Sequence, residues 1–439
     1  MAAANAMAKR RVMVTGMGVV SPFGVGKKVY WDGLSAGRSG VRLITSFDAS
    51  QLPTRFAATV PETDAELEAY VANQKALKTM SRSARFAVVA AAEAAGEAGL
   101  QPDTYDPIRL GTSLGAGGLG MMDLSFLIPA GRLIREAAST GNRGDAGKFW
   151  RELYEGINPV STLQWLPNIP TSHIAINHNA RGVSLTVATA CTSSAQAIGE
   201  AYRLIKNGVV DAMIAGGADS IINPYGLIAF SGLGVISRNN EEFETAARPF
   251  DRRRDGFVLG EGAAVFILED WEHCRRRSVT PYCEIIGYGS ASDAYRLTDE
   301  PPDAHGSISA MRMAVDDAAL SVDRIDYINA HGTGTPMNDR TETFAIKSLL
   351  GSHARSVPVS STKSMVGHLV AAAGAIEAAA TFLALRHQAI PPTINYLEPD
   401  PDCDLDYVPN VMRPAPIGIA LSNSFGFGGQ NACLIAAKF

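Results

Sequence analysis

The sequence has no uninterrupted apolar run of membrane-spanning length and no basic stripe. Its longest apolar run, "HLVAAAGAIEAAATFLAL", carries Glu377 in its middle, which predicts a buried helix rather than a membrane span. The formal net charge is −5 and the basic residues are dispersed along the chain. Nucleic acid is therefore not expected as a partner, and no membrane contact is predicted.

Cysteines are few and scattered. They form no CxxC pair, which argues against a zinc site of that type and against a disulfide framework. This usage predicts a reducing cytoplasm. The start "MAAANAMAKRRVMVTGMG" places its apolar stretch after the basic residues and inside an expected strand, so no signal peptide is predicted. The five cysteines are Cys191, Cys274, Cys283, Cys403 and Cys433.

Nucleotide-binding motifs are also missing. No Walker loop occurs, and the glycine-rich "TGMGVVSPFG" does not match GxGxxG, so it predicts only a turn between a strand and a helix.

What the chain does contain is an α/β rhythm, in which short apolar runs bounded by Gly and Ser alternate with longer Ala-rich helical patterns. The rhythm stops at the charged segment "EDWEHCRRRSVTP" and then restarts, which predicts two similar halves over residues 10–271 and 272–439. Two stacked sheets with shared helices and a site where the halves meet are expected. The expected strands are "RVMVTG", "RLGTSLG", "SLTVATA", "DAMIAGG" and "AVFILED", then "YCEIIGYGS", "IDYINAHGTG", "VPVSSTKS", "IALSNSFGFGG" and "ACLIAAKF".

Cys191 lies where the apolar segment "SLTVATA" runs into a helical pattern that ends near Gly208. A thiol at a helix N-terminus meets unpaired N–H groups and the positive end of the helix dipole, so a lowered pKa and a nucleophilic role are expected. A buried structural cysteine is the alternative from this segment alone.

Two histidines in the second half, His331 in "NAHGTGTP" and His368 in "KSMVGHLVAAAG", lie at strand-to-helix transitions among glycines and small polar residues. A lone turn histidine is commonly structural, but two of them beside a candidate nucleophile favour catalysis. Lys363 and Glu377 are either a buried pair that positions His368 or an ordinary surface ion pair. The hairpin "LSNSFGFGGQN" is either a tight turn or a source of backbone N–H donors for an oxyanion hole.

Several long motifs then occur in a fixed order, namely "TACTSS", "RPFDRRRDGFVLGEGAAV", "NAHGTGTPMND", "STKSMVGHLVAAAGAIEA", "PPTINY" and "NSFGFGG". Together they resemble the β-ketoacyl-[acyl carrier protein] synthase family, and most closely its type II elongating enzymes. The resemblance extends from "RRVMVTGMGVVSPFG" to the C-terminus. It implies an α/β, thiolase-like fold with two duplicated βαβαβαββ halves in a five-layer αβαβα arrangement.

The resemblance implies that Cys191 carries the acyl chain as a thioester, with His331 and His368 completing a Cys-His-His set. Lys363 would support His368, with Glu377 as the partner of the lysine. The backbone N–H groups of Cys191 and of the gating residue in the "GFGG" turn would hold the oxyanion. Two neutral histidines would each donate one N–H to the enolate formed when malonyl carrier loses CO2. The gate residues are Phe427 and Gly428.

This chemistry needs no organic cofactor. The resemblance also implies a structural Na+ or K+ near the site and acyl carrier protein as the partner that delivers both substrates. A homodimer is expected, with a heterodimer of related subunits as the alternative. The residues that match the cation ligands are Asn329, Glu377, Ser422 and Asn423.

The sequence departs from the family at several places. Ser194 and Ala371 replace common glycines, and residues 129–158 form an amphipathic insert that lacks a basic element used by relatives for carrier docking. Lys75 and Lys78 remain as candidate docking residues, although a solvated helix face explains them equally well.

Two residues, Ala116 and Phe230, are assigned to the acyl pocket. Ala116 stands where relatives place a bulkier aliphatic side chain, which predicts room for long or unusual acyl chains.

Three other protein classes fit the sequence less well. Thiolases typically have a second catalytic cysteine near the C-terminus, but here Cys433 falls within the final expected strand. The paired histidines and duplicated halves argue against a papain-like hydrolase. A chain-length partner subunit characteristically lacks the nucleophile, which this chain has. Fatty acid elongation and a dedicated polyketide or specialised-lipid pathway share all these residues and are both left open.

Overall fold

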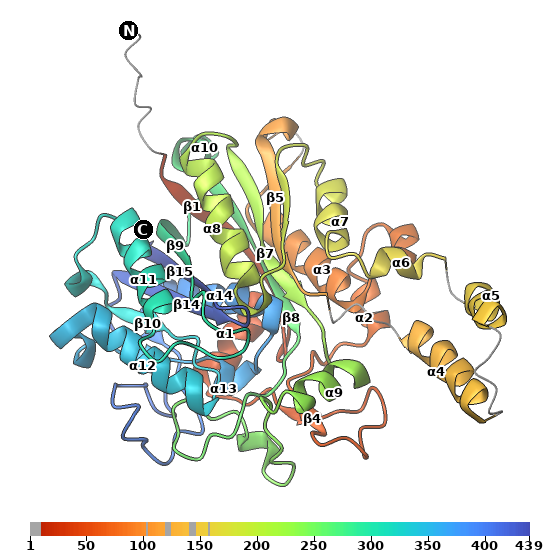
Figure 1. Cartoon of the computed structure of the whole chain (residues 1–439). Coiled ribbons are helices and arrows are strands. Elements are labelled where there is room, and N and C mark those ends of the chain that lie inside the picture. The colour runs from red at the N-terminus through yellow and green to blue at the C-terminus, as the bar shows by residue number, and fades with distance from the viewer. Residues whose placement is uncertain (1–9, 102–103, 119–123, 140–145, 157–158) are drawn as a thin grey trace.

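The computed structural model describes residues 10–101, 104–118, 124–139, 146–156 and 159–439. Each of the ten segments expected to be a strand contains one (Figure 1). In the first half these are β1 (Val12–Ser21), β5 (Leu110–Ala116), β6 (Ser184–Val187), β7 (Ala212–Asp219) and β8 (Gly262–Asp270). In the second half they are β9 (Cys283–Ser292), β10 (Tyr327–Asn329), β11 (Val359–Ser360), β14 (Ile419–Gly426) and β15 (Gln430–Lys438).

The predicted duplication is confirmed by the strand order. The first half reads β6-β5-β7-β8-β1 and the second reads β11-β10-β14-β15-β9. In each half the first three strands of this order pair in parallel, and the next two pairings are antiparallel, so only β8 and β15 run opposite to the other strands of their half. The two sheets are joined at one edge, where residues 12–14 of β1 pair with residues 283–285 of β9.

The helices form the remaining layers. Two helices, α8 (Ser193–Lys206) and α14 (Ala373–His387), pack against each other between the sheets. The outer face of the first sheet is covered by α3 (Arg82–Glu97), and that of the second sheet by α11 (His305–Asp317) (Figure 1). Residues 373–385 of α14 are all buried, as predicted from the Ala-rich run around Glu377. No helix among the described residues is long and apolar enough to cross a membrane.

The same close contact between a strand and its outer helix occurs in both halves. A Cβ on Gly18 of β1 would lie 1.9 Å from the carbonyl oxygen of Ala90 on α3, and a Cβ on Gly289 of β9 would lie 2.0 Å from that of Ala310 on α11. Glycine is required at both places because the helix backbone lies directly on the strand. The duplication therefore extends to individual packing contacts.

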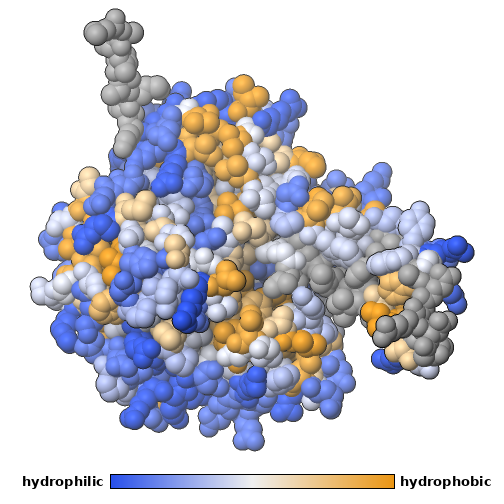
Figure 2. All heavy atoms as spheres, in the orientation of Figure 1, coloured by the Kyte–Doolittle hydropathy of each residue, from blue (hydrophilic) through white to orange (hydrophobic). Residues whose placement is uncertain are grey.

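Smaller elements complete the fold. In the insert, α4 (Leu124–Ser139) and α5 (Ala146–Gly156) pack against each other and project from the body of the molecule (Figure 1, Figure 2). Trp150 and Tyr154 on α5 are largely exposed. The other helices are α1 (Lys27–Ser35), α2 (Asp64–Glu68), α6 (Ser161–Gln164), α7 (Ile169–Asn177), α9 (Pro224–Gly232), α10 (Trp271–Arg276), α12 (Pro336–Leu350) and α13 (Lys363–Val366); the short strands are β2 (Gly24–Val25), β3 (Arg42–Leu43), β4 (Phe56–Ala57), β12 (Ala389–Ile390) and β13 (Arg413–Pro414).

Candidate active site

The carboxyl ends of the parallel strands from both halves meet at one cavity of about 600 Å³. In open α/β sheets ligands bind at the carboxyl ends of parallel strands, and the duplication brings two such ends together. Cys191, His331 and His368 all line this cavity. The cavity therefore combines residues from both halves of the chain, as the sequence predicts.

Cys191 lies in the short 3-10 turn η4 (Ala190–Thr192) directly before α8. The predicted position at a helix N-terminus is confirmed, but the expected lowered pKa is not. Burial raises the pKa of the Cys191 thiol to about 12, and this outweighs the opposing effects of the Lys363 charge and the Phe427 N–H. Desolvation of the charged form dominates here because the thiol is buried. Without substrate, the thiol is protonated at neutral pH.

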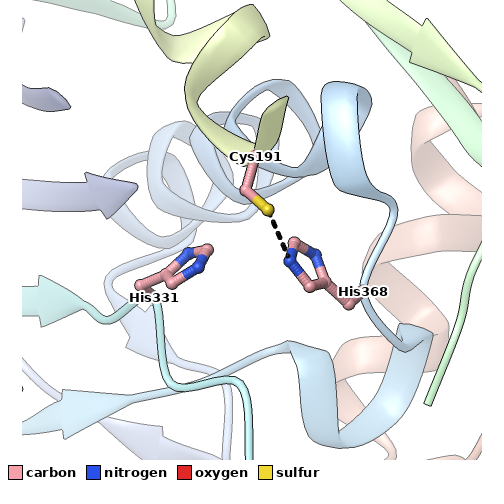
Figure 3. A group of neighbouring side chains, drawn as sticks. All are labelled: Cys191, His331 and His368. Atoms are coloured by element: carbon pink, nitrogen blue, oxygen red, sulfur yellow. Dashed lines mark hydrogen bonds between the residues drawn. The ribbon is translucent and has the colours of Figure 1, made fainter. Parts of the chain in front are cut away.

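His368 faces the nucleophile (Figure 3). Its Nε2 lies 3.1 Å from Cys191 Sγ, and its Nδ1 accepts the N–H of Val370 at 3.3 Å. The ring packs edge-on against Phe257 with centroids 5.0 Å apart. Because Nδ1 accepts a hydrogen bond, Nε2 of the neutral ring carries the proton and points it at the sulfur.

His331 follows β10, and its ring lies 5.3 Å from that of His368 at an angle of 84°. The Glu342 carboxylate on α12 accepts the N–H groups of His331 and Gly332 at 2.9 and 2.7 Å. Lys363 Nζ donates to His331 Nδ1 at 3.1 Å and to the His331 carbonyl oxygen at 2.6 Å. This ring therefore also directs an Nε2–H away from its lysine partner.

Lys363 and Glu377 form a buried ion pair, with side chains 2% and 1% exposed. The alternative of a surface ion pair is therefore excluded. The expected support of His368 by Lys363 is also wrong, because the lysine hydrogen-bonds His331 instead. Burial raises the pKa of Glu377 to about 7 despite the neighbouring Lys363 charge.

The Cys-His-His group has the spacing of a metal site, since its ligand atoms lie within 4.8 Å of one another. Metal-bound histidines usually donate their other ring N–H to an oxygen acceptor. Here the other nitrogen of each ring accepts a hydrogen bond instead, from Val370 and from Lys363. The surrounding residues thus favour two N–H donors facing Cys191 over metal ligands.

The pKa values of His331 and His368 are both well below the usual range, mainly because burial disfavours the charged ring. The unfolded chain therefore binds more protons below about pH 6.5, so the contribution of each histidine to stability is complete above that pH and falls by about 1.4 kcal/mol per pH unit below it. Burial raises the pKa values of Asp219, Glu342 and Glu377, which acts in the opposite direction.

The effect of the two histidines on the pH dependence of stability is therefore measured as the difference between wild type and a variant that lacks both rings. Urea unfolding between pH 7.5 and 5.5 should show that wild type loses more stability on acidification than a His331→Asn/His368→Asn variant. Equal pH slopes for the two proteins would contradict burial of neutral rings.

The "GFGG" turn lies beside the nucleophile. Phe427 lines the cavity, and its backbone N–H stabilises the Cys191 thiolate. Among the described residues, no hydrogen-bond acceptor is found for the Cys191 N–H. Gly428 does not line the cavity, and its N–H donates to the Leu297 carbonyl at 2.7 Å. The amide of Gly428 is therefore not available to an oxyanion.

Ala116 and Phe230 both line the cavity. Because a larger side chain at Ala116 would fill space where each buried methylene contributes roughly 0.8 kcal/mol, Ala116→Phe should shorten the longest acyl chain accepted. Competition between acyl carriers of different lengths measures this effect, with Ala116→Ser as the control. Identical chain-length profiles for Ala116→Phe and wild type would rule out the assignment.

The residues assigned to a monovalent cation fit that role in part. The side-chain oxygens Asn329 Oδ1, Glu377 Oε2 and Asn423 Oδ1 are buried and have no hydrogen-bond partner among the described residues. Ser422 pairs with Asn329 in the sheet. Oxygen ligands of this kind suit hard cations.

Other residues fall outside the site or were missed. Lys75 and Lys78 are exposed and do not line the cavity, and Cys433 is buried in β15 away from it. Sequence reasoning missed Asp219 and Glu342, both buried carboxylates at the site. The one available signal for Asp219 was an acid closing the apolar run "AMIAGGAD".

The comparisons agree with this geometry. The family models for the β-ketoacyl synthase N-terminal and C-terminal domains match residues 9–273 and 282–397. A 3-oxoacyl-[acyl-carrier-protein] synthase 2 from Coxiella burnetii is 41% identical over 98% of this chain and 99% of the relative. A putative polyketide beta-ketoacyl synthase 1 from Streptomyces cyaneus is 42% identical over 97% of this chain and 98% of the relative.

Solved structures give the same result. A type II polyketide synthase acyl-carrier protein in complex with its ketosynthase superposes with a TM-score of 0.86 at 32% identity, over 98% of this chain and 100% of that chain. The ishigamide ketosynthase/chain length factor superposes with a TM-score of 0.85 at 34% identity and the same coverage. The chain therefore belongs to the β-ketoacyl synthase family.

Proposed function

We propose that this β-ketoacyl synthase transfers an acyl chain from acyl carrier protein to Cys191 and condenses it with malonyl carrier, lengthening the chain by two carbons. The observation that carries the proposal is the contact of 3.1 Å between Cys191 Sγ and His368 Nε2, with a second neutral histidine, His331, beside it. A nucleophile that faces two N–H donors suits this reaction.

In the first step the sulfur of Cys191 attacks the carbonyl carbon of the acyl thioester. The negative charge that develops on the carbonyl oxygen is held by the N–H groups of Cys191 and Phe427. The bond between the acyl group and the carrier sulfur then breaks, and the carrier leaves as a thiol that takes the proton of Cys191. Burial raises the pKa of Cys191 to about 12. The transfer can still proceed, because no free thiolate has to accumulate.

In the second step the bond between the malonyl methylene and its carboxylate breaks and CO2 leaves. The electron pair forms an enolate, whose oxygen accepts the Nε2–H groups of His331 and His368. The enolate carbon attacks the acyl carbonyl, and the sulfur of Cys191 departs and is reprotonated from solvent. Both histidines are neutral because their pKa values are well below the usual range, so each can donate without releasing a proton.

A structural Na+ or K+ would be held by the unpartnered oxygens of Asn329, Glu377 and Asn423, with Ser422 beside them. The cation would supply positive charge to this buried polar cluster. Residues of the chain, rather than the cation, carry out every step described above.

Both pathways remain proposals. Fatty acid elongation is supported by the Coxiella relative and polyketide synthesis by the Streptomyces relative, which are equally similar to this chain.

Cytoplasmic location is supported by five unpaired cysteines. Lys75 and Lys78 are exposed and are proposed to contact the acyl carrier protein. A steady-state assay with saturated acyl carriers and malonyl carrier tests the reaction, because a β-ketoacyl carrier two carbons longer must form; no such product with any acyl carrier would exclude it.

A homodimer is proposed from an asymmetry between the halves. The outer strand of the second sheet, β11, is buried, but the equivalent strand β6 is exposed at Ser184 and only partly buried over residues 185–187. Unprotected edge strands favour pairing with another chain. Ile176, on the neighbouring helix α7, is 70% exposed. A related subunit is the alternative partner, as in the solved ketosynthase/chain length factor.

The dimer has its own test. Wild type should sediment as a dimer in analytical ultracentrifugation. Ile176→Asp should shift the equilibrium towards monomers, because a charge in a closely packed apolar interface is not compensated. The control is Val411→Asp, since Val411 is equally exposed but lies in the second half. A monomeric wild type, or dissociation by the control as well, would contradict pairing through β6.

A further inference from the structure

The turns that carry Cys191 and follow His368 are equivalent in the two halves. Each is a 3-10 turn, η4 (Ala190–Thr192) or η8 (Val370–Ala372), directly before a central helix. The first residue of each turn has a left-handed backbone, with φ 51° at Ala190 and φ 44° at Val370. The last residues have matching backbone angles, with φ −90° and ψ −6° in η4 and φ −88° and ψ −6° in η8. Ala371 is therefore the counterpart of Cys191.

The backbone N–H groups of these two counterparts have different surroundings. No acceptor of the Cys191 N–H is found among the described residues, whereas the Ala371 N–H donates to Asp219 Oδ2 at 3.0 Å. Asp219 and Gly426 are the last residues of the equivalent eight-residue strands β7 and β14. The first half therefore places a carboxylate where the second half has a glycine beside Cys191.

The hydrogen bond from Ala371 to Asp219 matters because the neighbouring residue, Val370, has a left-handed backbone. A left-handed backbone is a genuine outlier for a β-branched residue and must be held by its surroundings. The Val370 N–H donates to His368 Nδ1 at 3.3 Å, and the Ala371 N–H donates to Asp219 at 3.0 Å. The turn is also closed by the Ala372 N–H, which donates to the Leu369 carbonyl at 3.0 Å, but among the described residues only the bond to Asp219 links it to a side chain of the first half. The bond from the Val370 N–H fixes the tautomer of His368, so the turn geometry and the histidine are coupled.

Asp219 is itself rigidly held. It is 2% exposed, its Oδ1 accepts the N–H of Ser220 at 2.9 Å, and the Ser220 hydroxyl donates to Glu261 at 2.6 Å. Both carboxylate oxygens thus accept backbone N–H groups. An asparagine could accept only one of these bonds and would turn an NH2 group towards the other donor.

We propose that Asp219 is a positioning residue for the condensation step, which holds the strained Val370–Ala371 turn so that His368 presents Nε2–H to the enolate. The proposal rests on the condensation chemistry proposed above. It assigns Asp219 no contact with the reacting atoms. Because the oxyanion of the acylation step is held by the N–H groups of Cys191 and Phe427 instead, the two half-reactions should depend on Asp219 differently.

The test uses Asp219→Asn in the full-length protein and measures the two half-reactions separately. Acylation of Cys191 by acyl carrier, followed by intact mass, should stay within about threefold of wild type. Transfer from the isolated acyl-enzyme to malonyl carrier should slow by about tenfold to a hundredfold, the effect expected when a hydrogen bond to a charged group is lost. KM for malonyl carrier should change by less than about threefold.

The control is Asp326→Asn. Asp326 also accepts two backbone N–H groups, from Gly418 and Ile419 at 2.8 and 2.9 Å, but it does not line the cavity. This variant should keep both half-reactions. If Asp219→Asn transfers as fast as wild type, or loses acylation and transfer equally, the positioning role is wrong. If wild type itself transfers nothing, the proposed condensation fails instead.

A double variant tests whether Asp219 acts through the strained turn. It also provides a test if Asp219→Asn alone folds poorly. Glycine adopts a left-handed backbone without strain, so in a Val370→Gly background Asp219→Asn should slow transfer by no more than about threefold. The same double variant should fold even if Asp219→Asn alone does not. An equal loss in both backgrounds would show that Asp219 does not act through this turn.

Discussion

Cys191→Ala is expected to abolish acyl-enzyme formation and to reduce condensation to background. Cys191 is the only cysteine among the described residues that lines the cavity, and its sulfur contacts His368 Nε2 at 3.1 Å. Removing a nucleophile that forms a covalent intermediate costs far more than removing a hydrogen-bond partner. Intact mass after incubation with acyl carrier should show the acyl adduct on wild type and no adduct on the variant.

The matched control is Cys433→Ala. Cys433 is also buried, in β15, but it does not line the cavity. This variant should acylate at the wild-type rate, because its thiol does not reach the substrate. Loss of acylation in Cys433→Ala with a native fold would support a two-cysteine, thiolase-like mechanism. Retention of the adduct in Cys191→Ala would exclude Cys191 as the acyl carrier.

The second large effect is expected for Lys363→Met. The ammonium of Lys363 neutralises the buried Glu377 carboxylate and donates to His331 Nδ1 at 3.1 Å. Its removal leaves Glu377 without a counter-charge, and breaking a buried ion pair from one side costs about 3–5 kcal/mol of stability. His331 also loses the donor that directs its Nε2–H towards the substrate. Urea unfolding and the condensation assay should both show large losses at pH 7.

A double variant separates these two effects. In Lys363→Met/Glu377→Gln the uncompensated charge is gone, so stability should recover by more than half of the loss. Condensation should not recover, because His331 still lacks its donor. A Lys363→Met protein as stable and as active as wild type would contradict both roles. Recovery of activity together with stability in the double variant would reduce Lys363 to a purely structural residue.

Much of the fold was predictable from local pattern. The ten strands follow from apolar runs bounded by Gly and Ser, and the duplication follows from the repeat of that rhythm on both sides of "EDWEHCRRRSVTP". The position of Cys191 before a helix was equally local, because Gly208 and an apolar face define α8. The pairing of β1 with β9 was not predictable, since it depends on how two finished sheets meet.

The electrostatics of the site were harder to predict because they depend on burial by distant segments. The helix N-terminus predicted a lowered pKa for Cys191, but closure of the cavity by both halves raises the pKa to about 12. Sequence proximity likewise paired Lys363 with His368, whereas the fold brings Lys363 to His331. Asp219 lies 152 positions from Ala371, whose N–H it accepts, so the acid that closes "AMIAGGAD" does not by itself indicate this role.

The most direct test of the account is a chase of the isolated acyl-enzyme. Wild type is acylated, freed of excess acyl carrier and mapped by peptide mass, and malonyl carrier is then added. We expect the label to lie on the Cys191 peptide and to move in a single turnover to a β-ketoacyl carrier two carbons longer, with release of CO2. An acyl group on another residue, or one that is hydrolysed without forming the longer product, would contradict it.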